Sequence, residues 1–119
     1  MIRGVKFATI PVRDQERALK FYTGKLGFEI LTDQPLGDQR WIELGIRGAD
    51  TRVVLFAPPA EEGIGGFQPL VFWSDDVHKT YQEMSAKGVD FPEPPKTEHW
   101  GTSAMFQDED GNRFGLSSR

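Results

Sequence analysis

Cysteine is absent from this chain of 119 residues, and histidine occurs only twice. Without cysteine there are no disulfides, no thiolate nucleophile and no zinc–cysteine site. The net charge is −4 and the basic residues form no stripe, which argues against a nucleic-acid partner. No apolar run approaches the roughly 18 residues of a membrane span, and no signal-peptide pattern is present. We therefore expect a cytoplasmic protein that binds neither nucleic acids nor membranes.

Aromatic residues, in contrast, are plentiful. Nine Phe and three Trp are many for one domain of ordinary size. A small core takes some of them, and a ligand pocket is a natural place for the rest. The mild negative charge favours cationic or neutral ligands over anions.

The two halves of the chain share one order of predicted elements: a strand, a helix that ends at a glycine, and three further strands. Leu19, Tyr22 and Leu26 give the first helix its apolar stripe, and Asp110-Gly111 predicts a hairpin near the end of the chain. The predicted helices span 15–25 and 76–87, and the predicted strands span 5–12, 28–32, 40–46, 51–56, 67–73, 89–91, 102–107 and 112–116.

A segment rich in proline and glycine separates the halves. The expected organisation is one domain, residues 1–119, with a first module at about 1–57, a linker at about 58–66 and a second module at about 67–119. The linker glycines have neither the spacing nor the partner residues of a phosphate-binding loop, so a hinge is the preferred interpretation.

Several local sequences occur in an order and spacing typical of one family. They are Thr9–Asp14 leading into Ala18–Tyr22, then Leu26–Glu29, Arg40–Leu44, Trp100–Thr102 and Phe106–Asn112. Over essentially its whole length the chain resembles the vicinal-oxygen-chelate superfamily of glyoxalases, bleomycin resistance proteins and dioxygenases. The resemblance implies an α+β fold in which two βαβββ modules form a cup-shaped antiparallel sheet with helices on the outside. It also implies a homodimer, with cups built within one chain or between two.

The resemblance brings the metal site into question. Metal-dependent relatives take their ligands, normally His, Gln and Glu, from the first and last strands of each module. The corresponding residues here are Phe7, Val54, Pro69 and Gly115, and none of them can bind a metal. His78 on a helix and His99 in a loop have no converging carboxylates. We therefore expect no metal and no cofactor.

Strand alternation then predicts which side chains line the cup. Ile42 and Leu44 are expected to face the helix, so Trp41 and Glu43 face the ligand side. The candidate ligand-binding residues are Phe7, Trp41, Glu43, Arg52, Phe56, Trp73, His99, Met105 and Arg113, and the same alternation turns Thr9, Val71, Ser103 and Gly115 inward. For each aromatic residue, packing in a shrunken cavity is an equal alternative.

Glu43 has two interpretations. Paired with Arg52 or Arg113, it is structural; unpaired, its pKa rises and it becomes a candidate catalytic base or an anchor for a cation.

Three functions remain open at this point. The first is a metal-independent protein that sequesters a small aromatic or cationic compound, in the manner of bleomycin resistance proteins. The second is a lyase or isomerase that acts on a small oxygenated metabolite, through a displaced metal site or with Glu43 as base. The third is a dimeric scaffold without a ligand. The expected partners are a second copy of the chain and a small molecule.

Overall fold

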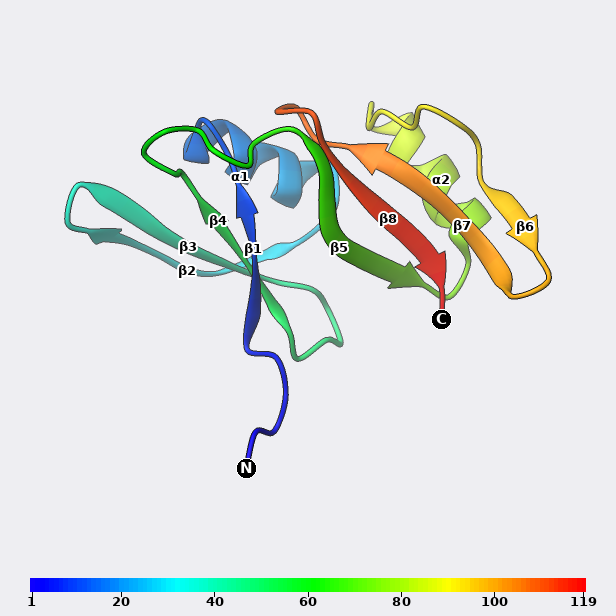
Figure 1. Ribbon diagram of the computed structural model, residues 1–119, viewed down its shortest axis with the longest axis horizontal. Helices are drawn as coiled ribbons and strands as arrows, with labels where there is room; N and C mark the ends of the chain where they lie inside the picture. Colours follow the sequence, from blue (N-terminus) through cyan, green and yellow to red (C-terminus); the bar gives the residue numbers. More distant parts are fainter. The chain divides into compact units, whose positions relative to one another are not determined.

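Each half of the chain folds into a four-stranded sheet with one helix against it (Figure 1). The computed structural model describes residues 1–119, and they divide into two compact units, residues 1–64 and 65–119. Each unit contains one copy of the predicted order of elements, so the repeat read from the sequence corresponds to a repeat in structure. The α+β class with two such modules is confirmed.

The first unit contains β1 (Phe7–Pro11), α1 (Gln15–Gly24), β2 (Glu29–Leu36), β3 (Gln39–Gly45) and β4 (Arg52–Phe56), in the sheet order β1-β4-β3-β2. The Asp14 side chain caps α1 by accepting a hydrogen bond from the backbone N–H of Arg17 at 3.1 Å. The core between helix and sheet includes fully buried Tyr22, Ile42 and Leu44.

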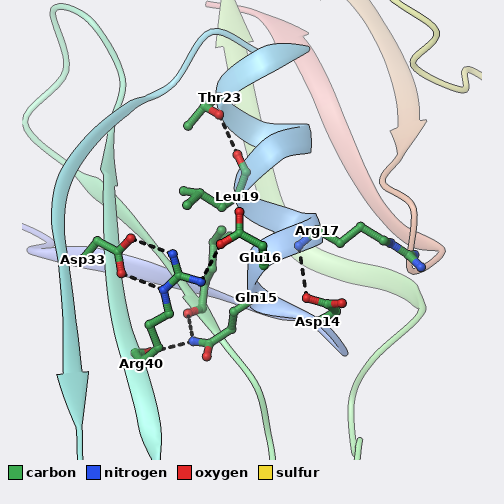
Figure 2. A network of polar contacts seen from close by, with 9 residues as sticks. Asp14, Gln15, Glu16, Arg17, Leu19, Thr23, Asp33 and Arg40 are labelled. Carbon is green, nitrogen blue, oxygen red and sulfur yellow. Dashed lines mark hydrogen bonds and ion pairs between the residues drawn. The ribbon is translucent and has the colours of Figure 1, made fainter.

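Two polar side chains fix α1 on the sheet (Figure 2). The Gln15 amide donates to the backbone carbonyls of Arg40, at 2.6 Å, and Leu55, at 3.0 Å. The Arg40 guanidinium in turn binds Asp33 of β2 at 2.7 Å and Glu16 of α1 at 2.9 Å, and its hydrogen bonds lower the pKa of Asp33. One arginine therefore connects the helix to the β2–β3 hairpin.

The second unit contains β5 (Gly66–Ser74), α2 (Val77–Ala86), β6 (Lys96–Glu98), β7 (Gly101–Gln107) and β8 (Asn112–Ser118), in the sheet order β5-β8-β7-β6. Asp76 caps α2 by accepting from the backbone N–H of Lys79 at 3.0 Å. Phe106 and Phe114 are buried in its core, with ring centroids 5.5 Å apart.

The sheets are mixed, which corrects the expectation of wholly antiparallel sheets. β1 pairs with β4 in parallel, and β5 pairs with β8 in parallel, whereas all other strand pairs are antiparallel. The helix is the cause, because a helical crossover returns the chain in the direction of the first strand. Two antiparallel connections then leave the last strand parallel to the first.

The predicted strand at 89–91 is also wrong. In that segment only Asp90 forms a bridge, to Gln107, and the edge strand is instead β6. Pro92, Pro94 and Pro95 follow directly and cannot donate to a strand ladder, so regular pairing begins after them. Val89 is buried, which explains its apolar character without a strand.

Neither α1 nor α2 has the length and apolar character needed to cross a bilayer.

Candidate functional site

The face of the first sheet opposite α1 has the composition that strand alternation predicts. Along β3, Ile42 and Leu44 are fully buried, whereas Trp41 and Glu43 are partly exposed on the other face. The pairing of Glu43 with Val54 and of Phe7 with Arg52 places side chains of three strands on this same face. The predicted strand phase is confirmed.

Four of these side chains form one connected group, the Glu43 cluster: Phe7, Trp41, Glu43 and Arg52. The rings of Phe7 and Trp41 meet edge to face, with centroids 5.6 Å apart. The Trp41 indole N–H donates to Glu43 Oε2 at 2.8 Å, and Arg52 Nη1 donates to Glu43 Oε1 at 3.1 Å. Each oxygen of the carboxylate therefore has a donor from the protein itself.

The Glu43 cluster decides between the two interpretations of Glu43. The indole hydrogen bond first, and then the bond from Arg52, hold the pKa of Glu43 below its ordinary value. The interpretation that required an unpaired carboxylate with a raised pKa is therefore corrected: Glu43 is paired, and Arg52 is its partner. A shift in this direction makes the carboxylate a poorer general base at neutral pH than an ordinary glutamate.

The second unit contains a hollow of about 570 Å³, here called the Trp100 hollow. It lies on the second sheet and is bordered by the segment that connects α2 to β6. Its lining residues are Val71, Pro92, Glu93, Pro94, Lys96, Trp100, Ser103, Ala104, Met105, Arg113, Gly115, Leu116 and Ser117.

Glycine at position 115 lets the Val71 side chain pack closely against β8 beside the Trp100 hollow, which both residues line. A Cβ atom at Gly115 would lie 3.1 Å from Cγ2 of Val71 on the neighbouring strand, closer than side chains normally approach. At the equivalent place in the first unit stands Val54, which is buried. The strand register supports this equivalence. Thr9 on β1 pairs with Val54 on β4, and Val71 on β5 pairs with Gly115 on β8.

The turn between β6 and β7 positions Trp100 beside the hollow. The next residue, Gly101, has φ +144°, and a Cβ atom there would collide with Oγ of Ser118. The same Ser118 oxygen accepts a hydrogen bond from the backbone N–H of Thr102 at 3.0 Å. Only glycine suits position 101, and its conformation fixes the direction in which the chain presents the half-exposed indole of Trp100.

Three charged side chains border the Trp100 hollow. Glu93 and Lys96 form an exposed ion pair at 3.5 Å. Arg113 is exposed on β8, and its side chain makes no hydrogen bond or ion pair with the protein. The hollow therefore combines an aromatic ring, a thioether and one arginine without an acidic partner.

Comparison with known proteins places this architecture in a family. Residues 4–116 match the Glyoxalase/Bleomycin resistance protein/Dioxygenase superfamily. The chain belongs to this superfamily.

Relatives within the superfamily match the chain from end to end. The Bacillus subtilis protein YetH is 37% identical over 118 residues, which are 98% of each chain. A superfamily member from Sphaerobacter thermophilus has a TM-score of 0.91 and 34% identity, covering 99% of this chain and 98% of its own. TnmS3, an antibiotic binding protein from Streptomyces sp. CB03234, has a TM-score of 0.88 and 38% identity, covering 98% and 96%.

The residues of this superfamily member do not fit a metal at the positions that the resemblance indicated. Phe7, Val54, Pro69 and Gly115 offer no nitrogen, oxygen or sulfur side-chain ligand. Within neither unit do three or more His, Asp or Glu side chains converge in the way a metal ion requires.

The structure distributes the nine candidate ligand-binding residues over both units. Phe7, Trp41, Glu43 and Arg52 form the Glu43 cluster, and Phe56 lies on the same face of β4. The other four candidate ligand-binding residues lie in the second unit: Trp73, His99, Met105 and Arg113.

Met105 and Arg113 line the Trp100 hollow. Trp73 lies on the same face of the sheet but outside the hollow, where its ring contacts the Arg119 guanidinium at 4.8 Å. His99 is exposed in the turn beside Trp100 and does not line the hollow.

Sequence reasoning missed Trp100 and the segment from Pro92 to Lys96. Alternation along strands selects residues only within strands, and these residues lie in a turn, a proline-rich connection and an edge strand. The available signal was the exposed aromatic next to a glycine at Trp100-Gly101, which is a common arrangement where a loop presents a side chain to a ligand.

Proposed function

We propose that this protein binds a small aromatic compound in the Trp100 hollow, without a metal or other cofactor, and that it acts as a homodimer. The observation that carries the proposal is a hollow of about 570 Å³ lined by Trp100, Met105 and Arg113. Small-molecule sites have this size and this mixture of apolar surface with a few polar groups. The 38% identity to the antibiotic binding protein TnmS3 supports binding as the function.

The contents of the hollow favour binding over catalysis. It contains no histidine, and its one carboxylate, Glu93, is exposed and paired with Lys96. The only other carboxylate considered as a base, Glu43, lies in the first unit and already accepts two hydrogen bonds. A lyase or isomerase would need a group that is able to move a proton at the bound substrate. The scaffold alternative, in turn, calls for a filled cavity, which the open hollow disfavours.

The test uses a neutral planar aromatic, 2-naphthalenemethanol, and isothermal titration calorimetry. We expect saturable binding, and we expect Trp100→Ala to weaken it by roughly 1–3 kcal/mol, the size of a lost aromatic contact. Lys79→Ala on the exposed side of α2 is the control and should leave affinity unchanged. Absence of saturable binding, or equal affinity in the Trp100→Ala variant, would contradict the proposed site.

Metal independence has its own measurement. Protein purified without added metal should contain no stoichiometric transition metal, and a chelator should leave both its melting temperature and its affinity for the probe unchanged. About one Zn, Ni, Fe or Mn ion per chain by elemental analysis would show that the protein is metal-dependent after all.

A further inference from the structure

The repeat makes Arg52 and Arg113 equivalent residues. Arg52 on β4 pairs with Phe7 on β1, and Arg113 on β8 pairs with Phe67 on β5. Both arginines are exposed and point to the face of their sheet that lies opposite the helix, because each is followed in its strand by a buried core residue, Val53 or Phe114. Each unit thus places a guanidinium at the equivalent position of its own sheet.

The residues next to the two arginines differ. In the first unit, Glu43 on β3 stands opposite Val54, and its carboxylate binds Arg52 at 3.1 Å. In the second unit, Met105 on β7 stands opposite Gly115, so Met105 occupies the place of Glu43. The second unit therefore keeps the arginine and lacks the acid that would pair with it.

The space around Arg113 also differs from that around Arg52. Where the first unit has the buried side chain of Val54, the second has Gly115, and the hollow extends over it. Met105 and Trp100 border the same space and offer surfaces that suit an aromatic ring. A guanidinium without a partner thus lies beside an aromatic binding surface.

From this comparison we infer that the Trp100 hollow selects aromatic carboxylates, with the ligand's carboxylate binding Arg113 in the way that Glu43 binds Arg52. The inference rests on the proposed function and names its ligand class. Arginine suits this task because its planar fork of N–H donors matches the two oxygens of a carboxylate.

Local charge outweighs the net charge of the protein in this selection. The chain carries −4 overall, which by itself would favour cations. Among the residues that line the hollow, however, Glu93 is offset by Lys96 at 3.5 Å, so Arg113 gives the lining an excess of one positive charge. Asp90 lies outside the lining and binds Gln107, which pairs with Arg113, at 2.6 Å. Exposed charges further away than a Debye length of about 8 Å are largely screened at physiological salt. Within the lining, Arg113 is therefore the charge that remains available to a ligand.

The test compares three ligands on one ring system: 2-naphthoate, 2-naphthalenemethanol and 2-naphthylmethylammonium. By titration calorimetry, wild-type protein should bind the carboxylate at least about tenfold tighter than the alcohol, and the ammonium more weakly than the alcohol. Arg113→Gln should abolish the preference for the carboxylate and leave affinity for the alcohol within about twofold. Arg47→Gln, at an exposed arginine of the first unit, is the matched control and should change nothing.

A second variant places the glutamate of the first unit, Glu43, at the equivalent position of the second unit, which is Met105. Met105→Glu should place a carboxylate beside Arg113, occupy it as Glu43 occupies Arg52, and reduce naphthoate binding by about tenfold or more. Its melting temperature should stay near that of the wild type, which separates an occupied arginine from an unfolded site.

The outcomes distinguish this inference from the proposed function. Equal affinity of the wild type for all three ligands would overturn the inference and leave the binding function standing, as would an Arg113→Gln variant that weakens all three equally. Failure of every ligand to bind would overturn both.

Discussion

Glu43 is held in its charged form by the Trp41 indole and the Arg52 guanidinium, one donor on each carboxylate oxygen. Its side chain is only 12% exposed, so few water molecules reach it. Both donors stabilise the ionised carboxylate, and its pKa in the folded protein is therefore lower than the ordinary value of 4.5. The position of Glu43 in the sequence suggested a binding or catalytic group, but these contacts give it a structural role.

The pH dependence of stability follows from the direction of this shift. The Glu43 contribution is fully present above the unfolded pKa of about 4.5 and is lost as the pH falls through the lower pKa of the folded state. Glu43→Gln should therefore melt a few degrees below the wild type at pH 7, and this difference should shrink as the pH falls below about 4.5. Calorimetric melting curves across this range measure it.

The matched control is Glu62→Gln, the same substitution at an exposed position, which should melt like the wild type at pH 7. A difference between Glu43→Gln and wild type that stays constant or grows in acid would show that the pairing with Arg52 and Trp41 does not stabilise the folded state.

Asn112 is a fully buried polar residue at the start of β8, and its side-chain amide connects three parts of the second unit. Its Oδ1 accepts hydrogen bonds from the Gly65 backbone N–H at 2.8 Å and from Gln68 at 2.9 Å, while its Nδ2 donates to Asp108 at 2.8 Å. Asn112→Ala would remove the hydrogen-bond partner of the Gly65 backbone N–H, the Gln68 amide and the Asp108 carboxylate at the same time. We expect a loss of about 2–4 kcal/mol in the free energy of unfolding.

Urea denaturation measures the Asn112→Ala effect, and Thr97→Ala is its control. Thr97 also has a side-chain hydrogen bond, to Thr102 at 3.0 Å, but it is exposed, so its loss should change stability by no more than about 0.5 kcal/mol. Similar losses in the two variants would contradict the role assigned to Asn112.

At the residue scale, the sequence could predict the face on which a side chain lies but not the atom it contacts. Strand alternation correctly placed Glu43 on the other face of the sheet from Ile42 and Leu44, because successive side chains of a strand point to opposite faces whatever their surroundings. The choice between Arg52 and Arg113 as its partner depends on which strands are neighbours, and that is a property of the folded sheet.

The position of α1 on the first sheet depends on Gln15 at the beginning of the helix. Its amide nitrogen donates to carbonyls of β3 and β4 at the same time (Figure 2). Gln15→Glu keeps the size of the side chain and replaces the donor with a carboxylate facing two carbonyl oxygens. We expect it to lower the free energy of unfolding by about 1–3 kcal/mol.

The control for Gln15→Glu is Gln82→Glu, the same substitution on the exposed surface of α2. Urea denaturation of both variants separates the lost hydrogen bonds from the added charge. Equal stability of the two variants would mean that Gln15 does not position the helix.

At the scale of elements, helices and central strands could be predicted, and an edge strand could not. The helices have capping residues, Asp14 and Asp76, whose chemistry acts within one turn of the chain. The edge strand β6 is short and fully exposed, so it lacks the alternation that marks a half-buried strand. Val89 resembles a strand residue in the sequence because a buried apolar residue in a loop gives the same hydrophobic pattern as a short strand.

At the scale of the whole molecule, the resemblance predicted the family and the fold but not the location of the hollow. The Trp100 hollow combines residues from three strands with the connection that follows α2. The lining of the hollow has an excess of one positive charge, opposite in sign to the net charge of the chain, so the ligand class inferred above differs from the one that composition suggests. Only the comparison of the two units, once folded, shows that Arg113 lacks the acid that Arg52 has.

Assembly into a homodimer is the part of the proposal that concerns the whole molecule. One face of β5 presents three large apolar side chains to solvent, Phe67, Val71 and Trp73, which are 62%, 60% and 55% exposed. Contiguous apolar surface of this kind usually mediates association, and closed pairing of two copies would also cover free sheet edges. We therefore expect light scattering at micromolar concentration to give twice the chain mass of 13.4 kDa. Val71→Glu should shift the protein toward the monomer by weakening association tenfold or more, whereas Gln82→Glu, which adds the same charge on α2, should leave the mass unchanged. A wild-type mass equal to that of one chain would refute the homodimer, and a dimer that tolerates Val71→Glu would move its interface away from β5.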